Sequence, residues 1–266
     1  MVRSRTNSVL TRRFVGELSG REPDELVVEE PLTIRLDDHQ VSSTMRTPGH
    51  DFELAVGFLH AEGVLEPDWV SGIRYCGTGS PVESEFNVVS VETGGRAPAP
   101  TARMGSISSS CGVCGTEAIE SLTERLRVLP AYDPWEAKML AGLPDLLRRH
   151  QPLFDTTGAV HAAAAVDRDG SLVVAREDIG RHNAVDKVAG RLLLDSLLPA
   201  NDLALVVSGR ASFEMAQKAW AAGYTALVAV SAPSALAVTT ARRAGLTLVG
   251  FTRNGQAKFY SPDHLV

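Results

Sequence analysis

The sequence predicts a mixed α/β protein in which a three-layer α/β domain follows a smaller, β-rich α+β part. Three observations predict this class. Short runs with alternating apolar residues fill residues 26–46, which is typical of strands. After residue 160, apolar strand-like runs alternate with helical patterns, which favours parallel strands joined by helical crossovers. The length of 266 residues suits one to two domains.

The N-terminal elements are expected as follows. Residues 1–22 are polar and rich in arginine and carry no periodic pattern, so we expect a flexible tail. Pro48-Gly49 ends the first group of strands, and Asp51 begins a helix that Gly63 ends. The predicted strands are 26–28, 32–36, 41–46 and 85–91, of which the second and third form a hairpin.

A long segment without periodicity separates these strands from two helices. Residues 93–110 are rich in glycine, proline, alanine and serine, and a stretch of this kind is uncommon in a compact domain unless it is a linker or a functional loop. It leads directly into two cysteines. The helical pattern then returns at 116–129 and 135–149.

In the C-terminal half, strand-like and helical sequence patterns alternate regularly. The Asp169-Gly170 pair between two apolar runs is a strong turn signal and predicts a β-hairpin of residues 160–166 and 171–175. We expect helices at 182–198, 212–222 and 234–244, and strands at 203–207, 226–230 and 246–251. The predicted division is therefore a tail at 1–22, a β-rich part at 23–130 and an α/β domain at 131–266.

The composition restricts the function. The 26 lysine and arginine residues against 32 aspartate and glutamate residues give a net charge of −6. This balance argues against a surface that binds nucleic acid through its phosphates, although it allows a local basic pocket. No apolar run reaches the roughly 18 residues of a membrane span, and no apolar signal segment follows the N-terminal arginines. We expect a cytoplasmic protein with no nucleic-acid or membrane partner.

Four predicted loops share one chemistry. In a parallel sheet, ligands bind beyond the carboxyl ends of the strands, where loops and helix N-termini meet. Glycines there allow close backbone approach, serine and asparagine offer hydrogen bonds, and three of the loops carry an arginine suited to phosphate. For any single loop, an ordinary turn with a solvated arginine is the favoured explanation. The four loops are 176–183, 208–210, 231–234 and 252–256, and together they favour a phosphate-bearing ligand.

Cys111 and Cys114 form a C-x-x-C pair at the predicted start of a helix, where a thiolate is favoured. A structural zinc site needs a second ligand pair that the sequence lacks. A dithiol oxidoreductase lacks the expected βαβ context. This function, persulfide carriage from a mobile loop and a pair of idle thiols all stay open. Cys76 has no partner in sequence, and we expect it to be passive.

The predicted order of elements after residue 160 resembles the cytidine deaminase fold. A zinc deaminase places H-x-E or C-x-E at the first helix and P-C-x-x-C at the next. The sequence has neither, because residues 181–184 read RHNA and residues 210–214 read RASFE. The resemblance therefore predicts the fold without its zinc chemistry.

The motifs together resemble those of the formate dehydrogenase accessory sulfurtransferases, the FdhD family. No single motif is sufficient, but their order is specific and spans nearly the whole chain after the tail. They are MRTPG at 45–49, EG at 62–63, SSSCGVCG at 108–115, TGAVHAA at 157–163, EDIGRHNAVDK at 177–187, SGR at 208–210, FEM at 213–215 and SAP at 231–233.

This resemblance implies a sulfurtransferase that accepts persulfide sulfur from a cysteine desulfurase. It implies delivery to the molybdenum or tungsten bis-pterin guanine dinucleotide cofactor, which formate dehydrogenase needs. Cys111 falls on the persulfide carrier and Cys114 on its helper. A guanine nucleotide is expected to occupy the cofactor site, and the homologues are dimeric, so we expect a homodimer. The implied cofactor-binding residues are Phe251, Thr252, Arg253, Asn254, Gly255 and Gln256, to which the loop argument adds Arg210.

Two functions of other classes compete with this one. A non-catalytic chaperone of the cofactor or of formate dehydrogenase would not need its thiols. A dithiol oxidoreductase would cycle a disulfide between Cys111 and Cys114 without gaining sulfur.

Overall fold

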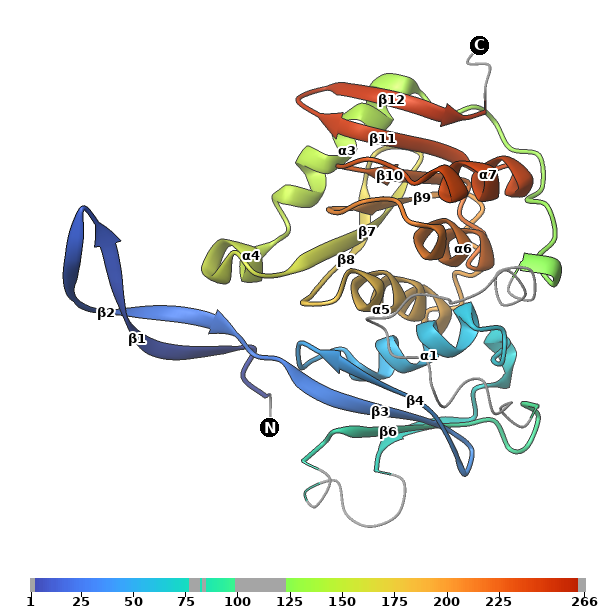
Figure 1. Ribbon diagram of the computed structural model, residues 1–266. Helices are drawn as coiled ribbons and strands as arrows, with labels where there is room; N and C mark the ends of the chain where they lie inside the picture. The colour runs from blue at the N-terminus through green and yellow to red at the C-terminus, as the bar shows by residue number, and fades with distance from the viewer. Residues whose placement is uncertain (1–2, 77–81, 83–84, 99–122, 263–266) are drawn as a thin grey trace.

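Two sheets, each covered by helices, make up the body of the protein (Figure 1). The structure is a computed structural model that describes residues 3–76, 82, 85–98 and 123–262. The smaller sheet has four strands in the order β4-β3-β6-β5. Its elements are β3 (Glu30–Leu36), β4 (His39–Arg46), α1 (Asp51–Ala61), the 3₁₀ turn η1 (Pro67–Trp69), β5 (Gly72–Tyr75) and β6 (Val88–Glu92).

The larger sheet has six strands in the order β12-β11-β10-β9-β7-β8. β9, β10 and β11 are parallel to one another, whereas β7 runs antiparallel to both β8 and β9. The elements are α3 (Ala137–Arg148), α4 (Pro152–Thr157), β7 (His161–Asp167), β8 (Leu172–Asp178), α5 (Arg181–Leu194), β9 (Leu203–Val207), α6 (Phe213–Ala221), β10 (Ala226–Ala229), α7 (Ala235–Ala244), β11 (Thr247–Arg253) and β12 (Gln256–Ser261).

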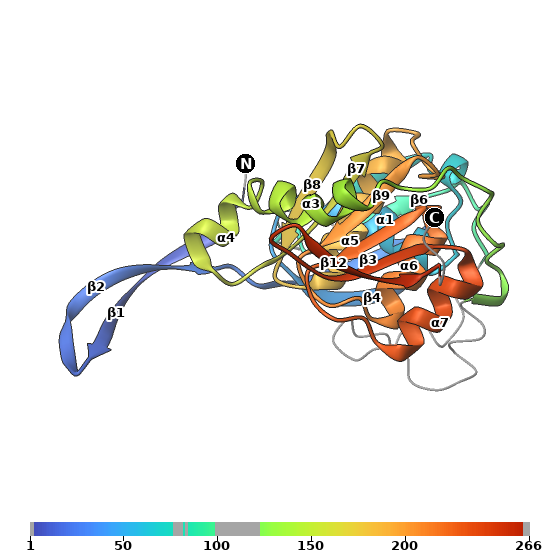
Figure 2. The same cartoon turned by 90° about the horizontal axis from the view of Figure 1, so that it is seen from above.

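Helices lie on both faces of the six-stranded sheet, which makes three layers (Figure 2). Alternate strand residues point to opposite faces, so neighbours such as Ala163 and Ala164 join different cores. The core under α3 contains Trp135, Leu140 and Leu147, and the core on the other face is built with α5, α6 and α7. The predicted three-layer arrangement is confirmed, while the closer resemblance to the cytidine deaminase fold stays a prediction.

α1 and α5 hold the two sheets together by an unusually close crossing (Figure 1). Each helix contributes a glycine at the contact. A Cβ atom added at Gly57 would lie 1.9 Å from the Asp186 carbonyl oxygen, and one added at Gly190 would lie 1.8 Å from the Glu53 carbonyl oxygen. Only glycine therefore allows these two backbones to approach as they do.

A buried carboxylate stabilises the same contact. Asp178 accepts hydrogen bonds from the backbone N–H of Thr47 at 3.1 Å, from Asn183 Nδ2 at 2.9 Å and from Lys187 Nζ at 2.6 Å. Lys187 Nζ also donates to the Thr47 carbonyl at 2.9 Å. Both charged side chains have 0% exposure, so each needs the other. Burial lowers the pKa of Lys187, and Asp178 opposes that shift.

Most of the predicted elements are confirmed to within a few residues. The hairpin of β3 and β4, the α1 helix that begins at Asp51, and the β7–β8 hairpin with its Asp169-Gly170 turn all lie where the patterns put them. The helix expected at 116–129 lies almost wholly outside the described residues. Within the described part, the sequence patterns missed β5, α4 and β12.

The expectation of a tail without secondary structure at residues 1–22 is wrong. β1 (Thr6–Val15) and β2 (Glu17–Val27) form an antiparallel hairpin that projects from the body (Figures 1 and 2). The prediction failed because these strands have no buried face. They lack the alternation of apolar and polar residues that marks a half-buried strand.

The glycine crossing gives a test of the fold. Gly57→Ala should lower the free energy of unfolding by about 2–3 kcal/mol, because the new methyl group meets backbone and not a movable side chain. Urea denaturation measures the change. The matched control is Gly142→Ala in α3, where nothing lies within 4 Å of the added carbon, and this variant should gain up to about 1 kcal/mol. Equal effects of the two substitutions would contradict the close crossing.

Candidate functional site

One edge of the six-stranded sheet collects the loops that the sequence singled out. β8, β9, β10 and β11 all run in the same direction, since β8 and β9 are both antiparallel to β7 and the other two are parallel to β9. Their carboxyl ends therefore lie along one edge. The N-termini of α5, α6 and α7 lie at this edge too, because each of these helices follows one of these strands.

Backbone hydrogen bonds hold three of the loops side by side. The Ser231 N–H donates to the Gly209 carbonyl at 3.2 Å, and the Phe251 N–H donates to the Ser231 carbonyl at 3.1 Å. The Ser234 N–H donates to the Ala211 carbonyl at 2.9 Å. The loops after β9, β10 and β11 thus form a continuous ledge with a fixed backbone.

The last of these segments is a hairpin and not the open loop that the sequence analysis expected at 252–256. β11 continues to Arg253, and β12 begins at Gln256 opposite it. Between them Asn254 and Gly255 have φ values of 53° and 72°. Asn-Gly with two positive φ angles is the preferred two-residue turn of a β-hairpin. The Asn254-Gly255 pair is therefore a sequence signal for this hairpin.

The structure exposes most of the predicted cofactor-binding residues. Arg210, Arg253, Asn254, Gly255 and Gln256 are all exposed.

The other two predicted residues of the ledge differ from these. Phe251 is 48% exposed at a φ of 51°, a left-handed conformation that is rare for an aromatic residue, and its ring lies 4.9 Å from Lys258 Nζ. Thr252 is fully buried, so its side chain faces the interior of the protein and not the open edge.

The predicted sulfur carriers cannot be placed on this edge. Cys111, Cys114 and most of the preceding loop lie outside the described residues. Cys76, for which we expect a passive role, is buried in the N-terminal part. Its backbone N–H donates to the Val88 carbonyl at 2.9 Å.

Four cationic or titratable side chains cluster at the centre of the edge. His161 begins β7 beside the end of β9, and a Cβ at Gly209 would lie 3.5 Å from its Nδ1. Burial lowers the pKa of His161, and the nearby Arg181, His182 and Arg210 lower it further. Sequence reasoning placed Arg181 and His182 in one of the four candidate phosphate loops and assigned no site role to His161. β7 lies antiparallel between β8 and β9, and this strand order brings His161 to the edge of the sheet. No short sequence motif predicts the strand order.

An acidic side chain borders this cluster. Glu214, in the first turn of α6, accepts a hydrogen bond from Ser212 Oγ at 2.9 Å and lies 3.6 Å from His182 Nε2. Contact with His182, against the penalty of burial, lowers the pKa of Glu214 to about 2. Glu214 therefore stays ionised at neutral pH and offers His182 a counter-charge.

The cluster has unused capacity for an anion. Arg181 Nε is buried without a hydrogen-bond partner among the described residues, whereas His182 Nε2 lies against Glu214. Buried donors are normally paired, so an unpaired guanidinium nitrogen at a helix N-terminus indicates a site for an added acceptor. With Arg210 exposed nearby, Arg181 can bind phosphate oxygens.

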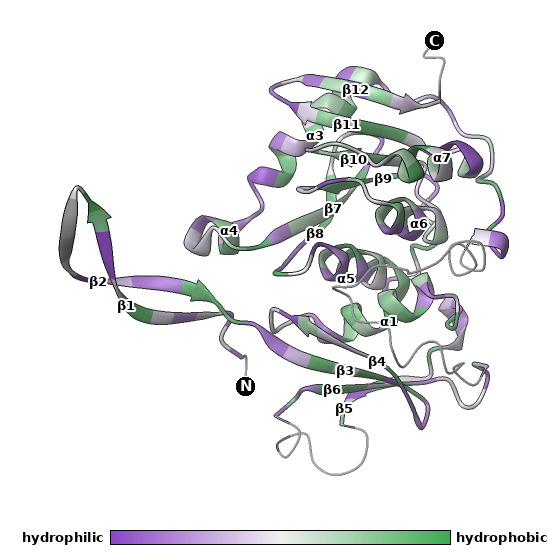
Figure 3. Cartoon of the chain, viewed as in Figure 1, coloured by the Kyte–Doolittle hydropathy of each residue, from purple (hydrophilic) through white to green (hydrophobic). Residues whose placement is uncertain are grey.

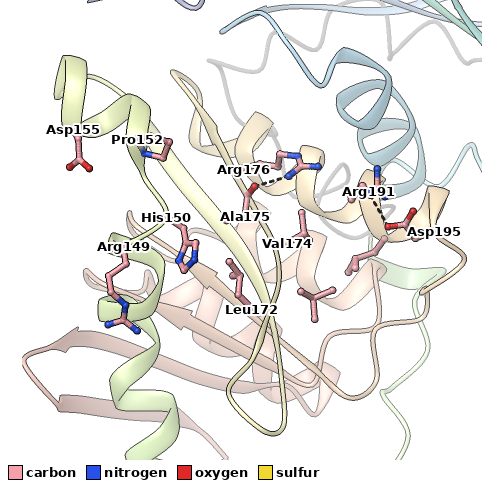
Figure 4. Close-up of a pocket in the computed structure, with 12 residues that line it drawn as sticks. Arg149, His150, Pro152, Asp155, Leu172, Val174, Ala175, Arg176, Arg191 and Asp195 are labelled. Carbon is pink, nitrogen blue, oxygen red and sulfur yellow. Dashed lines mark hydrogen bonds and ion pairs between the residues drawn. The ribbon is translucent and has the colours of Figure 1, made fainter.

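A hollow lies elsewhere on the protein, away from this edge (Figure 4). It measures about 720 Å³ and lies along the free side of β8, near the C-terminal ends of α3 and α5. Two of its arginines are occupied. Arg176 makes two hydrogen bonds to Glu53, at 2.6 and 2.8 Å, and Arg191 donates to Asp195 at 2.7 Å. The ledge is the better candidate, because the unpartnered Arg181 Nε beside it is buried, whereas the third arginine of the hollow, Arg149, is exposed to solvent.

Comparison with known proteins identifies the family. The model of the FdhD/NarQ family matches residues 27–266. The chain belongs to this family. A sulfur carrier protein FdhD of Streptomyces avermitilis is 48% identical over 260 residues, which cover 94% of this chain and 92% of that protein. A sulfur carrier protein FdhD of Mycolicibacterium paratuberculosis is 47% identical over 264 residues, with coverage of 95% and 97%.

A solved structure supports the fold of this FdhD/NarQ chain. A crystal structure of a protein from Desulfotalea psychrophila, assigned as a formate dehydrogenase accessory protein, superposes with a TM-score of 0.79. The match covers 99% of this chain and 100% of that one at 24% identity.

No helix in the described ranges is long and apolar enough to cross a membrane.

The cationic cluster gives a test of the site. Arg210→Ala should raise the pKa of His161, because one of the charges that disfavour the imidazolium is removed. An NMR titration of the histidine ring protons measures it, with His161→Gln used to assign the signal. Arg74→Ala, on the four-stranded sheet, is the control and should leave the titration unchanged. An unaltered His161 curve in Arg210→Ala would show that Arg210 is not part of the cluster.

Proposed function

We propose that this chain is a sulfur carrier that delivers persulfide sulfur to a guanine-nucleotide-bearing metal cofactor for formate dehydrogenase. The observation that carries the proposal is the ledge, where loops from three strands lie beside a cluster of cations in which Arg181 Nε has no partner among the described residues. The similarity to sulfur carrier proteins of the same family supports the sulfur-carrier part. A pyrophosphate-linked nucleotide suits such a ledge, because its charge needs several fixed donors.

The ledge has the parts that a bound dinucleotide requires. Arg210 and Arg253 are exposed and serve as the phosphate ligands in our proposal. Arg181, at the N-terminus of α5, adds a third positive charge that offsets the negative charge of the phosphates. The Ser231 backbone and the turn at Asn254-Gly255 approach the ligand closely, since neither presents a large side chain. Phe251, exposed in a left-handed conformation, offers a flat apolar face for a base.

Cys111 is the sulfur acceptor in this proposal. Its thiolate attacks the terminal sulfur of the desulfurase persulfide, and the old S–S bond breaks with its electron pair going to the desulfurase cysteine. The product is a persulfide on Cys111, and no external oxidant or reductant is needed. In the second step the Cys114 thiolate attacks the inner sulfur of the Cys111 persulfide, so that a Cys111–Cys114 disulfide forms and the outer sulfur leaves as sulfide with the electron pair of the broken S–S bond. The molybdenum or tungsten cofactor, which is the substrate, would accept that sulfide.

The partners in this proposal are a cysteine desulfurase, as donor, and formate dehydrogenase, which receives the sulfurated cofactor. The working unit is a homodimer. A cytoplasmic location suits both partners, because thiols stay reduced there.

A sulfur-transfer assay tests the proposal. Incubation of the chain with a cysteine desulfurase and free cysteine should add one sulfur atom to the peptide that contains Cys111, detected by mass spectrometry under non-reducing conditions. Cys111→Ala should abolish the added sulfur and the activation of formate dehydrogenase. Cys76→Ala is the matched control and should retain both, since Cys76 is buried elsewhere. A Cys111→Ala variant that still activates the dehydrogenase would favour a chaperone instead.

A further inference from the structure

His161 lies in contact with the ledge, although the proposed function gives it no role. It begins β7, and its ring lies against the loop that follows β9, where a Cβ atom added at Gly209 would be 3.5 Å from Nδ1 and 3.7 Å from Cε1. The Gly209 carbonyl accepts the hydrogen bond from Ser231 that joins two loops of the ledge. The next residue, Arg210, is one of the proposed phosphate ligands. The imidazole is therefore a neighbour of the phosphate site.

The ring of His161 is available to a ligand. Neither of its nitrogens has a hydrogen-bond partner in the described part of the chain, and the residue is only half-buried, so solvent reaches it. A protonated imidazole donates from both nitrogens, which suits phosphate oxygens. Within the described ranges, no three histidine, cysteine or acidic side chains converge as metal ligands. An anion is therefore the ligand that these surroundings favour.

Charged groups face His161 from three elements. α5 contributes Arg181 and His182, the loop after β9 contributes Arg210, and β8 contributes Asp178. Burial lowers the pKa of His161 from its ordinary value of 6.5, the three cationic groups lower it further, and Asp178 opposes them. His161 is therefore neutral at pH 7 in the free protein.

The acidic residues around the cluster are already engaged. Asp178 accepts a hydrogen bond from Lys187 Nζ at 2.6 Å, and both side chains are fully buried. Glu214, on α6, lies against His182 at 3.6 Å. Figure 3 shows hydrophobic strands within the six-stranded sheet and a hydrophilic first turn of α5. Charges at the end of an apolar sheet are screened less than charges in water, so a bound anion relieves their repulsion.

We propose that His161 is a further phosphate ligand of the ledge, which takes up a proton from solvent as the anion binds and then donates a hydrogen bond to a phosphate oxygen. Because coupling is reciprocal, a proton that strengthens phosphate binding is held more tightly when phosphate is bound. The affinity for nucleotide therefore rises as the pH falls, until His161 is protonated in the free protein as well. The inference rests on the proposed function, since it needs a phosphate-bearing ligand on the ledge.

Calorimetry with GDP-mannose tests this coupling. The pyrophosphate diester of this probe has no proton that titrates near neutral pH, so any proton exchanged belongs to the protein. Titrations in HEPES and in Tris, whose ionisation enthalpies differ, give the number of protons taken up. At about pH 7 the unmodified chain should take up about half a proton or more, and its affinity should rise about 3-fold or more between about pH 8 and pH 6.5.

Two substitutions assign the proton. His161→Gln should take up no proton and should bind with an affinity that does not change over this pH range. His39→Gln is the matched control, because His39 is exposed at the start of β4 on the other sheet, and it should behave as the unmodified chain does. Thermal unfolding checks that both variants are folded. In the unmodified chain, saturating GDP-mannose should also move the NMR titration of the His161 ring to higher pH.

The outcomes separate this inference from the proposed function. Binding without proton uptake, or an unmoved His161 titration, would overturn the role of His161 and leave the proposed function intact. Uptake that persists in His161→Gln would assign the proton to another group and overturn that role as well. If the unmodified chain bound neither GDP-mannose nor guanosine diphosphate, the nucleotide site of the proposed function would fail, and this inference would fail with it.

Discussion

The structure depends on the crossing of α1 and α5. Gly57 and Gly190 let the two backbones meet at a distance that any side chain would prevent. That contact joins the four-stranded sheet to the six-stranded one. It also brings Thr47 within reach of Asp178 and Lys187, a buried pair whose charges are neutralised only by each other and by the donors around them. Without the crossing, that network would leave two charges buried and unsatisfied.

The same network sets the position of the candidate site. Asp178 ends β8 and accepts hydrogen bonds from Gly180 at 2.8 Å and Asn183 at 2.9 Å, so it fixes the start of α5. The first two residues of that helix are Arg181 and His182, and Arg181 supplies the unpartnered buried donor next to the ledge. A rigid scaffold thus holds the cations in place before any ligand arrives. Such preorganisation is what an anion site needs, because the cost of gathering like charges has already been met during folding.

Sequence patterns predicted the regular elements well and the irregular ones poorly. The Asp169-Gly170 turn and the alternating strands and helices after residue 160 are local signals, and local signals can be recognised in one sequence. The hairpin of β1 and β2 has no buried face, so its apolar residues gave no period. The contribution of His161 depends on strand order, which no short motif encodes, and the role of Gly57 depends on a helix from the other part of the chain. The assignment of Cys111 as the sulfur acceptor comes from the resemblance to a known family and not from a local sequence pattern.

The central claim is that the ledge binds the nucleotide part of the cofactor, and isothermal calorimetry with guanosine diphosphate tests it most directly. The account predicts that the unmodified chain binds and that Arg210→Ala and Arg253→Ala each weaken binding by about 10-fold or more. Arg168→Ala should bind as the unmodified chain does, because Arg168 lies at the opposite edge of the sheet, in the turn between β7 and β8. Unchanged affinity in both ledge variants would contradict the account.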